Sequence, residues 1–458
     1  MKLTLVGGGG VRSPLFVMSL LNWQARIGVT ELCLMDIDPH KLELFGALCR
    51  EVVHRAGNPF KLTVTTDPRE ALTGASHVVT TIRVGQERGR AIDERIALRH
   101  GVLGQETTGP GGFAMALRSI PALLEYARLL QEVSPGAWMY NFTNPSGLVA
   151  QALRDAGFER TIGICDGANG GQGAIAGWLG VEPARVRAEV FGLNHLSWCR
   201  RAWLDDAEQM QPALKDDRFL SQMQPLFDPG LVRQVGAHCN EYLYYYYYAE
   251  QALAAIRAEG QTRGEEIVEL NQRLMDQLEE IGVERNPERA LRAFFGYEKR
   301  RGATYMHYAY GSQSIEEANR QQMFDADIPA SAGEGYAGVA LSVINALVNG
   351  GSLYTALNVP NRGAIQGMDS DDVVEVSCRV DANGVQPLQV GEISPAQLNL
   401  MRTVKLYERL TVAAIQQRSR ELAVQALMVH PLVLSYPRAR ALVDEYLSVH
   451  AAYVGEWN

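Results

Sequence analysis

The chain has 458 residues, 47% of them hydrophobic and 21% charged, which is enough for two or three ordinary globular domains. Its formal net charge of −9 argues against nucleic acid or an anionic membrane as the partner. The six cysteines are scattered and form no disulfide framework, no apolar run is long enough to span a bilayer, and the apolar start is too short for a signal peptide. We therefore expect a cytoplasmic protein with reduced thiols.

Residues 1–185 predict a Rossmann-like domain with a doubly wound parallel sheet. An apolar strand at 2–6 meets four glycines, a helix follows from Pro14 to Trp23, and ELCLMDID forms a second strand. A helix at 39–56 and the apolar segments KLTVTT, SHVVTTIRVG, AWMYNFTNP and TIGICD continue the alternation. Strands that are apolar throughout and are separated by helices are typical of a parallel sheet covered on both faces.

Residues 186–458 predict a second, larger domain of the α+β class that is mostly helical. Helical patterns run over 262–283, 333–349 and 418–451, the last interrupted at Pro431 and Pro437. No linker rich in proline, glycine or serine separates the two parts, so we expect this domain to pack closely on the first. We assign substrate binding, catalysis and oligomer contacts to it.

The segment LVGGGGVRSP predicts a dinucleotide site, because glycines after a strand let the backbone approach a pyrophosphate at a helix N-terminus. Asp36 ends the second strand, where a carboxylate would bind a ribose hydroxyl and favour NAD over NADP. The third glycine position of the motif is occupied by Arg12, and a tight turn without a ligand is the alternative. The predicted cofactor-binding residues are Gly7, Gly9, Gly10, Asp36 and Arg83.

Two further features of the sequence are candidates for metal binding or catalysis: a cysteine with a histidine, and a run of tyrosines. Cys165 ends a strand in GICDGANGG, at the sheet edge where α/β proteins bind ligands, and His195 in FGLNHLSW is a possible partner. From the residues alone, packing in the core is favoured over metal ligation for both. The run EYLYYYYYAE holds Tyr242 and five further tyrosines at 244–248. These fill a core at helical spacing, or one of the phenols reacts.

Long motifs along the chain resemble glycoside hydrolase family 4. They include GVLGQETTGPGGFAMALRSIPALLEYA, MYNFTNPSGLVAQAL, GLNHLSW, YLYYYY and NRGAIQGMDSDDVVEV. The family consists of NAD- and metal-dependent glycosidases with a fold like that of lactate dehydrogenase. The segments GQETTGPGGF, FTNPSG and YLYYYY are most similar to those of the 6-phospho-β-glucosidases.

The resemblance implies a mechanism that differs from the usual two-carboxylate scheme of glycosidases. NAD⁺ oxidises the sugar at C3, a base removes the C2 proton, the C1 oxygen leaves by elimination, water adds and the hydride returns. Cys165 and His195 would bind the divalent metal, which is Mn²⁺ in most members, and Tyr242 would be the base. Asp166 would be the proton donor; members that act on α-linked substrates carry Asp here, whereas β-acting members usually carry Asn.

The resemblance also implies the substrate site. Asn144 and Glu106 match substrate-contacting positions, and Arg90 and Arg301 match arginines near the sugar phosphate, for which bidentate donors are suited. MHYAYG after Arg301 and Ala168 depart from the family pattern. A 6-phospho-α-glucosidase or an unphosphorylated glycosidase therefore stays an alternative. A lactate- or malate-type dehydrogenase and an NAD-binding protein without turnover are alternatives of other classes. Family members are commonly homodimers or homotetramers.

Overall fold

The computed structural model describes residues 1–310, 322–329 and 335–458. The chain divides into two compact units, each assembled from three stretches of sequence. Unit 1 consists of Met1–Ile92, Glu125–Thr143 and Ala255–Asn345. Unit 2 consists of Asp93–Leu124, Asn144–Ala254 and Ala346–Asn458. The domain boundary at residue 185 stays a prediction.

Unit 1 contains a parallel sheet in the order β5-β4-β1-β2-β3. Its strands are β1 (Lys2–Val6), β2 (Glu31–Met35), β3 (Lys61–Thr65), β4 (Ala75–Thr80) and β5 (Trp138–Asn141). Val6 is paired with Met35 on one side and with Thr80 on the other, so β1, β2 and β4 end at the same edge. This sheet confirms the predicted Rossmann-like fold.

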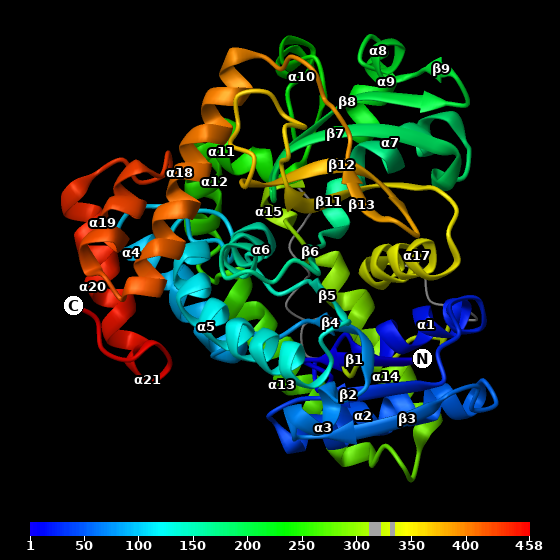
Figure 1. Ribbon diagram of the computed structural model, residues 1–458. Coiled ribbons are helices and arrows are strands. Elements are labelled where there is room, and N and C mark those ends of the chain that lie inside the picture. Colours follow the sequence, from blue (N-terminus) through cyan, green and yellow to red (C-terminus); the bar gives the residue numbers. More distant parts are fainter. Residues whose placement is uncertain (311–321, 330–334) are drawn as a thin grey trace. The chain divides into compact units, whose positions relative to one another are not determined.

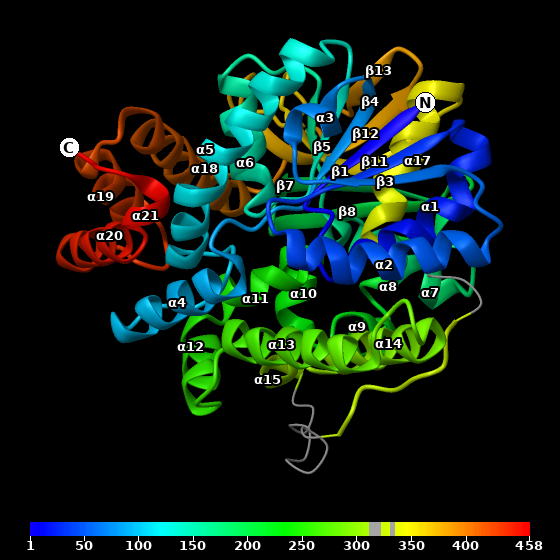
Figure 2. The same ribbon diagram turned by 90° about the horizontal axis from the view of Figure 1, so that it is seen from below.

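The helices of unit 1 begin with strong local signals. Asp38 caps α2, its Oδ1 accepting a hydrogen bond from the backbone N–H of Lys41 at 3.1 Å, and Pro39 follows at the first helical position. Helices α13 and α14 pack on α2 (Figure 2). The helices wholly or partly in unit 1 are α1 (Ser13–Ile27), α2 (Pro39–Arg55), α3 (Pro68–Leu72), α4 (Gln86–Arg99), α5 (Pro110–Val133), α12 (Ala249–Ala258), α13 (Arg263–Ile281), α14 (Pro287–Ala303), α15 (His307–Tyr310) and α17 (Gly335–Asn349).

Unit 2 contains strands that the sequence patterns did not predict. Near the end of the chain, β11 (Leu353–Pro360), β12 (Val373–Asp381) and β13 (Gly384–Pro387) form antiparallel neighbours, and β11 pairs with β6 (Thr161–Gly163). A second sheet is built around the hairpin of β7 (Val186–Leu193) and β8 (Leu196–Leu204), with the short β9 (Ala207–Glu208) and β10 (His238–Cys239) on β8.

The helices of unit 2 include a group of neighbours at the C-terminus, coloured orange to red in Figure 1. The pattern at 418–451 is corrected here: α19 ends before Pro431, but Pro437 lies in the first turn of α20, where its fixed φ suits a helix start. These helices are α18 (Pro395–Gln417), α19 (Arg420–Val429), α20 (Tyr436–Val449) and α21 (Ala451–Val454). The others are α6 (Ser146–Asp155), η1 (Asp166–Asn169), α7 (Gly170–Leu179), η2 (Pro183–Arg185), α8 (Met210–Ala213), α9 (Asp217–Met223), α10 (Pro229–Val235), η3 (Glu241–Leu243) and α11 (Tyr244–Tyr247).

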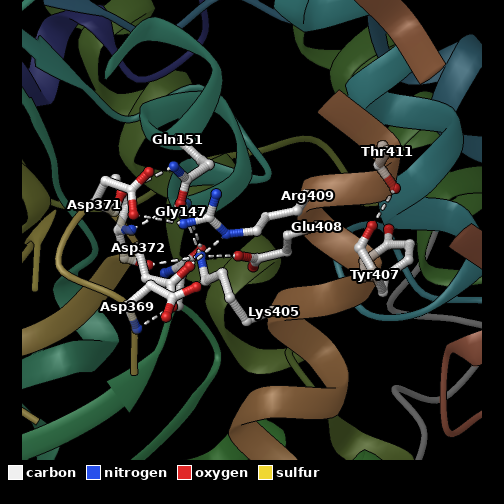
Figure 3. Close-up of polar contacts among 12 residues, drawn as sticks. Gly147, Gln151, Asp369, Asp371, Asp372, Lys405, Tyr407, Glu408, Arg409 and Thr411 are labelled. Atoms are coloured by element: carbon white, nitrogen blue, oxygen red, sulfur yellow. Dashed lines mark hydrogen bonds and ion pairs between the residues drawn. The ribbon is translucent and has the colours of Figure 1, made fainter. Parts of the chain in front are cut away.

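A buried polar cluster joins α18 to α6 and to the start of β12 (Figure 3). The Lys405 ammonium forms an ion pair with Glu408 and donates to the Val373 carbonyl at 2.7 Å and to Gln151 Oε1 at 3.3 Å. Gln151 Oε1 also accepts from the Val373 N–H at 2.7 Å. Because these groups are buried, each needs its partners, and the cluster fixes α6 in place. Gly147, in the first turn of α6, is thereby held too.

Candidate active site

The glycine turn after β1 has no room for larger residues. Gly7 has φ +99°, and a Cβ added there would lie 2.6 Å from Thr81 Oγ1. A Cβ on Gly8 would lie 2.7 Å from the Leu34 Cβ atom. The turn leads directly into α1, whose first N–H groups are the donors that bind phosphate oxygens in dinucleotide sites. A bare backbone at a helix N-terminus fits the pyrophosphate of NAD.

Asp36 lies at the end of β2, beside this turn. Its carboxylate accepts hydrogen bonds from the backbone N–H groups of Gly9 and Asp38, both at 3.1 Å, while burial raises its pKa. The next residue, Ile37, is 77% exposed. A carboxylate followed by an exposed apolar side chain fits a ribose hydroxyl and the flat face of a base. Ile37 was not predicted from the sequence, although an apolar residue between two aspartates is a visible signal.

Two of the arginines predicted in unit 1, Arg83 and Arg301, lie beside acidic partners. Arg83 Nε is 3.2 Å from Glu87, and Arg301 is 3.8 Å from Glu298. Burial raises the pKa of Glu298, and Arg301 and Arg12 both oppose that rise, so the two guanidinium groups lie close to one carboxylate. Arg90 is buried on α4. Arg12, at the third glycine position, therefore lies near the same carboxylate as Arg301.

In unit 2, Cys165 and His195 come together from segments 30 residues apart. Cys165 follows β6 and precedes η1, and His195 occupies the turn between β7 and β8 with φ +61°. The Cys165 Sγ atom is 3.4 Å from His195 Nε2, and both residues are buried. A cation bound at about 2.3 Å to sulfur and about 2.1 Å to nitrogen would hold these atoms roughly 3.1–3.6 Å apart. The pair fits a shared metal. Within the described ranges, no set of three or more His, Cys, Asp and Glu gathers into a ready ligand group.

Thr107 orients the imidazole of His195. Its hydroxyl lies 3.1 Å from Gln105 Oε1, to which it donates, and 2.8 Å from His195 Nδ1. A hydroxyl that donates to Gln105 can accept from an Nδ1–H, which leaves the Nε2 lone pair facing Cys165. Burial lowers the pKa of His195 to about 4, so the ring is neutral near pH 7. A neutral ring with a free Nε2 is the form that binds a metal.

Tyr242 stacks on His195, with ring centroids 3.7 Å apart and planes inclined by 11°. Of the other tyrosines, Tyr244 and Tyr248 stack on each other, as expected for one helical face. Tyr245 contacts Tyr242 edge-on, but Tyr246 packs against His430 instead of joining them. Most of the run is therefore core packing, and Tyr242 alone among these tyrosines stacks on the His195 ring.

The remaining predicted residues of unit 2 are Glu106, Asn144 and Asp166. Asp166 begins η1 and is exposed, because β6 ends at Gly163 and the strand does not continue. The charges of Glu106 and Asp166 both raise the pKa of His195, against the larger effect of burial, so both carboxylates are near it. Asn144 is half-buried directly before α6. The predicted residues in unit 1 are Gly7, Gly9, Gly10, Asp36, Arg83, Arg90 and Arg301, and those in unit 2 are Glu106, Asn144, Cys165, Asp166, His195 and Tyr242.

Thr107 and a hydrogen-bond network centred on Glu375 were not predicted from the sequence. Glu375 lies on β12, fully buried, and accepts hydrogen bonds from Ser197 Oγ at 2.7 Å and from the side-chain amides of Asn194 and Asn358, both at 3.2 Å. The signal was present: a carboxylate in the apolar strand VVEVSCRV has to be paired.

Two family models together match most of the chain. The model described as "Family 4 glycosyl hydrolase" matches residues 2–181, and "Family 4 glycosyl hydrolase C-terminal domain" matches residues 190–433. A probable 6-phospho-β-glucosidase of Bacillus subtilis is 30% identical, with 100% of this chain and 98% of the relative covered. A maltose-6′-phosphate glucosidase of Clostridium acetobutylicum is 26% identical, with 100% and 99% covered.

Solved structures show the same relationship. The 6-phospho-β-glucosidase of Thermotoga maritima with manganese, NAD⁺ and glucose-6-phosphate has a TM-score of 0.83 at 26% identity, over 100% of both chains. A lactate dehydrogenase of Eimeria maxima has a TM-score of 0.51 at 13% identity over 90% of this chain and 94% of its own, a likeness of fold alone. In the part of the chain that is described, no helix combines the length and apolarity needed to cross a bilayer. By its family models and relatives, the chain belongs to family 4 of the glycosyl hydrolases.

Proposed function

We propose that this protein hydrolyses the O-glycosidic bond of 6-phosphoglucosides, with NAD and a divalent cation as cofactors. The pairing of Cys165 Sγ with His195 Nε2 at 3.4 Å, under the stacked ring of Tyr242, carries the proposal. Relatives named as phosphoglucosidases, and solved relatives that hold NAD⁺, manganese and glucose-6-phosphate, support it. A dehydrogenase of the lactate type has only the fold likeness in its favour.

Each cofactor has residues suited to it. Asp36 and the glycine turn would hold the ribose and pyrophosphate of NAD, and Cys165 and His195 would hold the cation. When bound, NAD accepts and returns a hydride, and the cation withdraws electrons from the sugar oxygens beside the carbon that loses its proton. Thiolate and imidazole are soft ligands for Mn²⁺, so we expect weak binding of that metal and tighter binding of later first-row metals.

Tyr242 is the proposed base for the C2 proton. A free phenol has a pKa of about 10, so removal of its proton near pH 7 requires about 4 kcal/mol of stabilisation of the phenolate. A cation held by the neighbouring His195 would supply positive charge at that place. Asp166, exposed and close to the same imidazole, is the proposed donor to the departing oxygen. Their proximity to one ring supports both proposed roles.

We propose the β-linked 6-phosphoglucosides as substrates, because the relative at 30% identity and another at 29%, from Escherichia coli, are named for that linkage. Asp166 favours the α-linked substrates as the second candidate, since a carboxylic acid at this position can protonate the leaving oxygen. Arg301, Arg90 and the neighbouring Arg12 are the proposed phosphate ligands, by their charge and donor geometry.

A panel of p-nitrophenyl α- and β-glucosides, with and without a 6-phosphate, tests the proposal. With NAD⁺, Mn²⁺ and a reductant, release of nitrophenol from a phosphorylated β-glucoside is expected, with solvent deuterium incorporated at C2 of the product. Release from the α-linked substrate alone would establish the second candidate. Stoichiometric NADH from a hydroxy acid, or NAD binding with no turnover of any glycoside, would contradict the proposal. Light scattering would test whether the protein is also a homodimer or homotetramer, as we propose.

A further inference from the structure

Glu375 is the hub of a buried hydrogen-bond network in unit 2. Its Oε1 accepts from the side-chain amides of Asn194 and Asn358, and its Oε2 accepts from Ser197 Oγ. Asn194 and Ser197 belong to the β7–β8 hairpin, whereas Asn358 lies on β11 next to β12. A carboxylate is an acceptor only, so three donors match it and fix its orientation.

Asn194 connects this network to the cysteine. Its Oδ1 lies 3.4 Å from the Gly147 N–H in the first turn of α6, and its amide donates to Glu375, so both ends of the side chain are held. Burial raises the pKa of the Cys165 thiol well above its usual value, and a hydrogen bond from the Asn194 side chain acts in the opposite direction. Asn194 directly precedes His195 in the turn between β7 and β8, so a carboxylate that holds the Asn194 amide also holds the residue next to the imidazole.

We propose that Glu375 is a positioning residue for the metal: it holds the Asn194 side chain at 3.2 Å, and through it the turn that carries His195, and so sets the affinity of the Cys165–His195 pair. The inference rests on the proposed function, because it concerns the cation of that site. Groups that orient metal ligands from outside are worth roughly 10- to 100-fold in metal affinity. In this proposal the metal affinity depends on where the Glu375 carboxylate lies, and not on its negative charge.

Two conservative variants separate placement from charge. Glu375→Asp keeps the charge but withdraws the carboxylate from Asn194 by one methylene. Glu375→Gln loses the charge but keeps an oxygen for both amides, because the Ser197 hydroxyl can accept from the new NH₂ group. Ser377→Ala is the matched control: Ser377 is buried on the same strand and its hydroxyl joins β12 to β7 through Val190 N and Ala188 O, both at 2.8 Å.

The readout is binding of Co²⁺ and Mn²⁺ to the full chain by calorimetry, with the thiolate-to-cobalt charge-transfer band as a signature of Cys165. We expect Glu375→Asp to weaken binding about 10- to 100-fold. Glu375→Gln and Ser377→Ala should stay within a few-fold of the wild type. The double variant Glu375→Asp/Asn194→Ala should bind no more weakly than Asn194→Ala alone.

Three results would overturn the inference: wild-type affinity in Glu375→Asp, a loss in Glu375→Gln as large as in Glu375→Asp, or additive losses in the double variant. A failure of the proposed function looks different. In that case Co²⁺ added to the wild type would give no thiolate-to-cobalt band, or it would give a band that persists in Cys165→Ser.

Discussion

The rings of His195 and Tyr242 lie face to face, with centroids 3.7 Å apart and an interplanar angle of 11°. The stack places a phenol on the imidazole that also faces the Cys165 sulfur at 3.4 Å. A phenol in this position can exchange a proton with a substrate held by the same residues, and its ring also shields the imidazole from water. The contributions of the Tyr242 hydroxyl and of its ring can be measured separately by mutation.

Tyr242→Phe keeps the stack and removes the hydroxyl. We expect kcat to fall by roughly 10²- to 10⁴-fold, the usual contribution of a general base, with NAD and metal affinities retained. Tyr247→Phe is the control: the Tyr247 hydroxyl accepts from Trp198 Nε1 at 3.1 Å, so its loss costs stability but leaves turnover intact. Steady-state kinetics on the active substrate measure both. Unchanged kcat in Tyr242→Phe would move the base to another residue.

Thr107→Val tests the hydrogen bond that selects the tautomer of His195. The Thr107 hydroxyl is 2.8 Å from Nδ1, and its removal frees the ring to place its proton on Nε2, so we expect metal affinity to fall about 10-fold or more. Thr108→Val is a close control, since the neighbouring Thr108 hydroxyl is buried and has no hydrogen-bond partner among the described residues. Calorimetric titration with Co²⁺ compares the two. Equal affinities would show that Thr107 does not orient the ring.

Local patterns predicted the nucleotide half of the molecule well. The strand at 2–6, the helix at 39–56 and the glycine turn depend on neighbours in sequence, and the structure has them within one or two residues, apart from a longer α1. The predicted Cys165–His195 pair came from resemblance, because nothing local shows that a 3₁₀ helix after β6 meets a hairpin turn. Thr107, Asn194 and Glu375 were missed for the same reason. Thr107 acts through His195, 88 residues away, and Asn194 and Glu375 act through each other, 181 residues apart, and hydrophobic periodicity carries no such information.

Lys405→Met tests the buried cluster of Figure 3. Loss of the ammonium leaves the Glu408 carboxylate buried without its cation, which typically costs about 3–5 kcal/mol. We expect a large fall in the midpoint of thermal unfolding, followed by circular dichroism. The double variant Lys405→Met/Glu408→Leu should recover much of it, because an apolar pair leaves no isolated charge. Arg420→Met, which breaks an ion pair with Asp444 in which both side chains are about half exposed, should cost less than about 1 kcal/mol. If the double variant unfolded at the same temperature as Lys405→Met, the buried Lys405–Glu408 ion pair would not explain the loss of stability.

Asp36→Asn tests cofactor choice. A hydrogen bond to a charged group is worth about 1.5–3 kcal/mol, so NAD⁺ affinity should fall roughly 10- to 100-fold, with less discrimination against NADP⁺. Asp38→Asn is the matched control, because Asp38 caps α2 and asparagine caps a helix equally well. Fluorescence titration with both nucleotides measures the effect. A wild-type NAD⁺ affinity in Asp36→Asn would remove this carboxylate from the nucleotide site.

Glu375 also predicts how stability depends on pH. Burial raises its pKa from 4.5 to about 7, outweighing the downward effect of its three hydrogen-bond donors. The folded protein therefore binds a proton that the unfolded chain releases between pH 4.5 and about 7, so this residue favours folding at the acid end of that window. Its contribution is lost as the pH rises through the window, and amounts to at most about 3 kcal/mol.

Glu375→Gln, which mimics the protonated acid, should make the unfolding midpoint less dependent on pH between 5 and 7.5, with its largest gain over the wild type at the upper end. Parallel melting curves without added metal measure this difference. A wild-type slope in the variant would show that Glu375 is already ionised throughout the range.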